Sequence, residues 1–255
     1  RKAGLVIAPN QLFEHQTISE LAMFVSLENE TSNIAEVMVL GDVALTPIQE
    51  WFFETHKTAP EYWNQIFRIT DLPKNFNKSI LIETTNHVVK IHDALRLSFH
   101  LNEDKWNAKI LSPNDIDAFI TFDISDEDTS NYNSKIEVML KDIQEKITLE
   151  KGNLFKCIYF ETGNIETNTV MLLAHHLVID FVSWQIILEC YTDAILNNKH
   201  IGKGTKTASI KTWNNHLLDL ANSKIITNEI DFWKAQKANK NNIPVVLDPV
   251  GVGAT

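Results

Sequence analysis

The chain has 255 residues, of which 44% are hydrophobic and 22% charged, so it can fold into one or two globular domains. Its formal net charge of −10 argues against nucleic acid as a partner, because phosphate binding calls for a basic surface. No apolar run approaches the roughly 20 residues of a membrane-spanning helix, and no secretory signal is recognised. We therefore expect a cytoplasmic protein without a membrane partner, whose two cysteines stay reduced.

The first 27 residues are predicted to be the end of a preceding domain. Thr17 and Glu20 have the spacing of a capping box, which predicts the start of a helix. The stretch from Leu12 to Ala22 resembles the last loop and helix of a peptidyl carrier protein, a family that holds its substrates on phosphopantetheine. That family's Gly-Gly-x-Ser attachment motif does not precede Leu12, so we expect no thioester on this segment.

A linker is predicted at residues 28–42, where the sequence is polar and has no periodicity. From Val43 onward, helical and strand periodicities alternate, which indicates an α/β body spanning residues 43–237. Within it we predict a helix with Leu81 to Leu95 on one face and a hairpin that turns at Asn102–Lys105.

Further elements follow in the second half of this body. Ser134 and Glu137 have capping-box spacing and predict a helix start. Residues 154–160 and 169–174 are predicted strands around a turn, and Ser183 is predicted to cap the helix that comes next.

The last segment, residues 238–255, differs in character from this body. Its end, Asp248-Pro-Val-Gly-Val-Gly-Ala-Thr255, resembles a strand and loop of hydroxyethylthiazole kinase, which would offer backbone amides to phosphate. Because nothing before it is kinase-like, we interpret it as a foreign tail from a truncated or fused reading frame.

The chemistry is concentrated in one segment, His175-His176-Leu-Val-Ile-Asp180-Phe-Val-Ser183-Trp184. Histidine exchanges protons near neutral pH, and an apolar run delivers this pair to the end of a predicted strand. Side chains alternate along a strand, so the two rings are expected on opposite faces.

Four motifs occur in an order that resembles the condensation and epimerization domains of nonribosomal peptide synthetases. They are P-I-Q-x-W-F at 47–52, H-x-x-L-R-x-x-F at 92–99, L-x-x-G-x-L-F at 149–155 and H-H-x-x-x-D-x-x-S-W at 175–184. The first motif and the Ser-Trp ending of the last are similar to epimerization domains in particular. The resemblance implies a lobe like chloramphenicol acetyltransferase, with a mixed central sheet and flanking helices.

The resemblance also implies roles for single residues. His176 would be the acid/base group that acts on the alpha carbon of an aminoacyl or peptidyl thioester, delivered on the phosphopantetheine of a carrier protein. His175, Asp180, Arg96, Ser183 and Trp184 would build the site. We expect His176 to face a cavity at the surface of the lobe and His175 to pack inward. Asp180 is expected to pair with Arg96, because a buried unpaired charge is costly. No metal and no cofactor bound by the lobe itself are expected.

Two departures from the family pattern affect the expected activity. Phe181 occupies a position where the family has glycine, and its ring would narrow the path of the carrier arm. The second lobe of such domains, with its opposing glutamate, is expected to lie outside this chain, which would leave half an active site. The alternatives are a condensation domain that forms peptide bonds and a non-catalytic module that docks carriers. A kinase fragment is the outside alternative.

Overall fold

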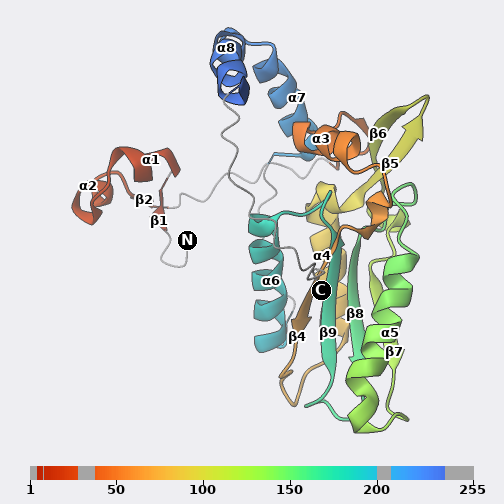
Figure 1. Ribbon diagram of the computed structural model, residues 1–255. Helices are drawn as coiled ribbons and strands as arrows, with labels where there is room; N and C mark the ends of the chain where they lie inside the picture. The colour runs from red at the N-terminus through yellow and green to blue at the C-terminus, as the bar shows by residue number, and fades with distance from the viewer. Residues whose placement is uncertain (1–4, 8, 28–37, 200–207, 239–255) are drawn as a thin grey trace, which may run out of the picture.

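The computed structural model describes residues 5–7, 9–27, 38–199 and 208–238 (Figure 1). Residues 5–27 contain two short strands and two short helices. Thr17 caps the second of these helices through the predicted capping box with Glu20. These elements are β1 (Leu5–Val6), α1 (Pro9–Glu14), α2 (Ile18–Ala22) and β2 (Ser26–Leu27).

A four-stranded mixed sheet forms the centre of the body. Its strands lie in the order β4 (Asn64–Ile69), β9 (Thr169–His175), β8 (Phe155–Glu161) and β7 (Phe119–Asp123). The β7–β8 pair is parallel and the other two pairs are antiparallel. All seven residues of β9 are buried, so this strand is covered on both faces and carries His175 into the interior.

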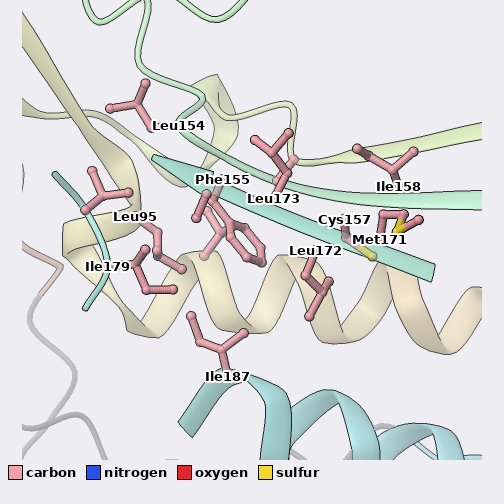
Figure 2. Close-up of a cluster of buried hydrophobic side chains, with 14 of the residues drawn as sticks. Leu95, Leu154, Phe155, Cys157, Ile158, Met171, Leu172, Leu173, Ile179 and Ile187 are labelled. Carbon is pink, nitrogen blue, oxygen red and sulfur yellow. The ribbon is translucent and has the colours of Figure 1, made fainter. Parts of the chain in front are cut away.

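Helices cover the sheet (Figure 1). Helices α4 (Ser79–Ile91) and α6 (Phe181–Leu196) pack against each other, and α5 (Tyr132–Glu145) lies beside β7. Figure 2 shows Phe155 and Leu172 pointing from the sheet toward α4, with Ile187 reaching up from α6. This mixed sheet with flanking helices confirms the predicted fold class.

A second sheet has the order β3 (Gly41–Val43), β6 (Lys105–Ile110) and β5 (Leu97–Asn102), which confirms the predicted hairpin. Its turn residues Glu103 and Asp104 have φ angles of 47° and 63°, the left-handed geometry of a tight hairpin turn.

The remaining described elements are helices and 3₁₀ turns. The described helices that remain are α3 (Pro47–Thr55), α7 (Ile210–Ala221) and α8 (Lys224–Ala238). The single-turn 3₁₀ helices are η1 (Pro60–Tyr62), η2 (Asp93–Arg96), η3 (Pro113–Asp115) and η4 (Thr129–Asn131). Among the residues described, no helix is long and apolar enough to cross a membrane.

Two helix boundaries differ from the predictions. Helix α5 begins at Tyr132, directly after η4, so Ser134 lies within the helix and caps nothing. Helix α4 ends at Ile91, and Leu95 belongs to η2. In both cases a 3₁₀ turn adjoins the α-helix, and periodicity alone does not separate the two kinds of turn.

Candidate functional site

The His-His segment lies where β9 ends and the chain turns toward α6. His175 is the last strand residue, and its N–H donates to the carbonyl of Leu154 at 2.9 Å. The N–H of His176 donates to the carbonyl of Trp63 at 2.8 Å, just before β4. Strands on both sides of β9 therefore position the pair.

His175 is completely buried, as the strand alternation predicted. Its Nδ1 accepts the N–H of Leu177 at 3.1 Å, so the ring proton is on Nε2, which donates to the carbonyl of Pro60 at 2.7 Å. The ring of Phe52 meets it edge-on, with centroids 6.0 Å apart. Burial lowers the pKa of His175 to about 4, so this imidazole is neutral at physiological pH and acts as a structural brace.

His176 is exposed on the surface of the lobe. Its Nδ1 lies 2.7 Å from the carbonyl oxygen of Ile179. A carbonyl can only accept, so in the neutral ring the proton is on Nδ1 and the lone pair is on Nε2. The side chain thus presents a basic nitrogen in a fixed tautomer, which is what a general base requires.

Asp180 does not form the predicted ion pair. It is the N-cap of α6, and its Oδ1 accepts the N–H of Ser183 at 2.7 Å. Hydrogen bonds from the Ser183 side chain and backbone lower the pKa of Asp180. The prediction that Ser183 caps α6 is also wrong, because the helix begins at Phe181 and the cap falls three residues earlier.

Arg96 is fully buried, but it does not have the predicted role as the partner of Asp180. Its Nε donates to the carbonyl of Val89 at 3.1 Å, and its Nη1 donates to the carbonyls of Val39, at 3.4 Å, and Leu111. The guanidinium therefore ties η2 to α4 and to the segments beside the second sheet. Backbone oxygens accept hydrogen bonds from Nε and Nη1, where we had predicted the Asp180 carboxylate. The buried Nη2 has no hydrogen-bond partner among the described residues.

Trp184 and Phe181 both lie at the start of α6 but differ in solvent exposure. Trp184 is buried, and its indole Nε1 donates to Oε1 of Gln65 at 2.7 Å, which joins the helix to β4. Phe181 is 72% exposed. As the first residue of α6 it is not among the described residues with positive φ, so the backbone there does not require glycine.

Sequence reasoning did not single out Gln49, which joins the first motif to the histidine loop. Its Nε2 donates to the carbonyl of Leu177 at 3.0 Å. Its Oε1 accepts the N–H of Thr46 at 2.9 Å, in the capping box of α3. The Thr46–Gln49 spacing was a visible signal for the cap, but its second bond reaches 128 positions along the chain.

A small cavity of about 70 Å³ adjoins the loop, lined by His92, Ala94, Leu95, Val178, Ser183, Ile186 and Ile187. His176 does not line this cavity, although we had predicted that its ring would face one.

Within the described parts of the chain, no group of three or more His, Cys, Asp or Glu side chains is placed to hold a metal ion.

Comparisons with known proteins place the chain in a family. The sequence matches the condensation domain family over residues 39–249, and the chain belongs to that family. The match extends beyond Lys237 into the predicted tail. Residues 239–255 lie outside those described, so the kinase resemblance stays a prediction, as does the carrier resemblance of residues 1–27, which the family match does not cover.

Relatives and solved structures agree with this assignment. Gramicidin S synthase 1 of Brevibacillus brevis is 32% identical over 257 residues, which cover 96% of this chain and 22% of that protein. Tyrocidine synthase 2 of Brevibacillus parabrevis is 30% identical, over 91% of this chain and 6% of its own length. The chain therefore spans a small part of these relatives.

Among solved structures, the epimerization domain from the third module of tyrocidine synthetase B matches 79% of this chain with a TM-score of 0.69 and 28% identity. The chain covers 46% of that domain. The starter condensation domain of rhizomide synthetase shares the fold, with a TM-score of 0.64 at 16% identity. The predicted resemblance to condensation and epimerization domains of nonribosomal peptide synthetases is confirmed.

Proposed function

We propose that this chain is the N-terminal lobe of an epimerization domain, which inverts the alpha carbon of an aminoacyl or peptidyl thioester. The exposed His176, with Nδ1 bound to Ile179 and Nε2 free, is the observation that carries the proposal. Support comes from the P-I-Q-x-W-F and Ser-Trp motifs and from the 28% identity with an epimerization domain.

The chemistry needs a base on one face of the alpha carbon and a proton donor on the other. Nε2 of His176 removes the alpha proton, and the electrons of the C–H bond pass to the thioester carbonyl as an enolate. A donor on the opposite face returns a proton to the carbon and completes the inversion. By family resemblance this donor is a glutamate of a second lobe, and the 46% coverage of the solved epimerization domain supports that partner.

The substrate arm belongs to another domain. A peptidyl carrier protein presents the thioester on phosphopantetheine, and the lobe itself contributes side chains without a cofactor of its own. The two free cysteines favour a reaction in a reducing compartment such as the cytoplasm. The other predicted site residues support the site through the packing, capping and hydrogen bonds described above. They are His175, Asp180, Ser183, Trp184 and Arg96.

Deuterium exchange tests the proposal. The 255-residue chain, and the same chain joined to a second lobe from an epimerization domain, are incubated with an L-aminoacyl carrier protein in deuterated water. We expect no exchange at the alpha position with the chain by itself and measurable exchange with the joined protein. His176→Ala should abolish the exchange, and Phe181→Gly should increase it if the exposed ring narrows the path of the arm.

Other outcomes identify the competing functions. Exchange that persists in His176→Ala removes the proposed base and contradicts the epimerase. Amide bond formation between two loaded carriers, lost in His176→Ala, assigns the lobe to condensation, the function for which its family is named. Carrier binding without either reaction in the joined protein would assign a docking role.

A further inference from the structure

The loop that follows β9 is held mostly by main-chain groups. Besides the bond from His176 to Trp63, the N–H of Val178 donates to the carbonyl of His175 at 3.0 Å. Two carbonyls of the loop accept side-chain donors: Ile179 accepts His176 Nδ1, and Leu177 accepts Gln49 Nε2. The second of these donors, Gln49, lies on helix α3.

The amide of Gln49 has a defined orientation. The side chain is only 4% exposed, and its Oε1 is occupied by the N–H of Thr46. The N–H of Gln49 in turn donates to Thr46 Oγ1 at 3.3 Å. With the oxygen committed to the cap, the NH₂ group must point at Leu177, so one side chain serves helix α3 and the histidine loop at once.

The anchored carbonyl lies one residue after His176 and two before Ile179. A shift of the peptide that follows Leu177 moves the carbonyl of Ile179, which sets the tautomer of His176. Loss of the Gln49 donor leaves the Leu177 oxygen without this partner and frees that peptide to rotate.

We propose that Gln49 is a positioning residue for His176. Through Leu177 it holds the loop in the one arrangement that keeps the proton on Nδ1 and the lone pair on Nε2. The inference rests on the proposed function for the use of that lone pair, whereas the tautomer itself can be observed without any activity.

The variant that isolates this role is Gln49→Glu. A glutamate keeps an oxygen for the N–H of Thr46, so the capping box survives, but it has no N–H for Leu177. Gln49→Met removes the donor without adding charge and serves if the glutamate variant does not fold. Thr46→Ala weakens the cap and leaves the Gln49–Leu177 bond, and Gln185→Glu adds the same charge at an exposed position of α6.

The measurement is ¹⁵N NMR of the histidine rings in the full chain at pH 8, with His176 assigned by its loss in His176→Gln. We expect the wild type, Thr46→Ala and Gln185→Glu to show the proton on Nδ1. In Gln49→Glu and Gln49→Met the ratio of the Nδ1–H to the Nε2–H form should fall roughly fivefold, as expected for one lost hydrogen bond.

Two results would overturn the inference. One is a wild-type His176 with its proton on Nε2. The other is an unchanged tautomer ratio in both Gln49 variants, which would make Gln49 a structural residue only. Absence of deuterium exchange in the joined protein would instead refute the proposed function and leave this result standing.

Discussion

His175 and His176 are adjacent in the sequence, yet the main chain holds their rings in opposite tautomers. His175 carries its proton on Nε2 and is buried, whereas His176 carries its proton on Nδ1 and is exposed. The strand separates the two rings, and a backbone carbonyl fixes the tautomer of each.

Burial of His175 predicts a pH-dependent stability. Its pKa of about 4 lies below the ordinary value of 6.5, so the unfolded chain binds this proton more readily than the folded chain. The free energy of unfolding should therefore be highest above pH 6.5 and fall between pH 6.5 and 4, by up to about 3 kcal/mol.

Urea unfolding at a series of pH values measures this dependence. His175→Gln should be less stable at pH 7 and should lose most of the slope in that window. The exposed His216→Gln should keep the slope. His92, whose pKa is also lowered by burial, adds a contribution of the same sign that both variants retain. An unchanged slope in His175→Gln would contradict the predicted role.

Substitutions of Asp180 distinguish a helix cap from an ion pair. Asparagine caps helices about as well as aspartate but carries no charge. We expect Asp180→Asn to unfold within a few tenths of a kcal/mol of the wild type and Asp180→Ala to lose about 1 kcal/mol, as measured by denaturant unfolding. A large loss in Asp180→Asn would show that the charge of Asp180 contributes to stability, which a capping role alone does not explain.

The bond between Trp184 and Gln65 predicts a cost for removing either partner. Trp184→Phe keeps the aromatic packing but leaves Gln65 Oε1 without its donor, which should destabilise the fold by about 1–3 kcal/mol. Thermal and urea unfolding would measure the loss. The double variant with Gln65→Met should recover part of it, because the unpaired oxygen is then also gone. Strictly additive losses would mean that the bond contributes nothing.

Cysteine labelling probes the core. Burial raises the pKa of Cys157 to about 12 and also raises that of Cys190, which is only partly buried. Because the thiolate is the reactive form, native Cys157 in a Cys190→Ala background should resist a thiol reagent at pH 8 and react only on unfolding. Cys190 in a Cys157→Ala background should react faster. Rapid labelling of native Cys157 would contradict the packing of β8 against α4.

The sequence was sufficient where local periodicity determines the outcome. Strand alternation predicted that His175 faces inward, and the turn residues at Glu103 and Asp104 predicted the hairpin. It failed where the partner is distant. The sequence indicated that the charge of Arg96 needs hydrogen-bond partners. The main-chain oxygens that accept from it, such as those of Val39 and Leu111, cannot be predicted from residue types.

The same limit applies to the candidate site. Nothing in the sequence identified Pro60, Trp63 or Ile179, because each acts through a backbone carbonyl. The motifs specify residues whose side-chain chemistry matters, such as His176 and Gln49. The groups that orient them become visible only when β4 and β9 are paired.

Backbone anchoring of both rings affects how this site can vary. Substituting Pro60, Trp63 or Ile179 changes a side chain but leaves the carbonyl in place, so the ring geometry can persist among relatives that share about a third of their residues. An inserted or deleted residue between Ala59 and Asn64 would instead shift the Pro60 and Trp63 carbonyls against β9 and disturb both histidines at once. The site is thus tolerant of point changes and intolerant of changes in loop length.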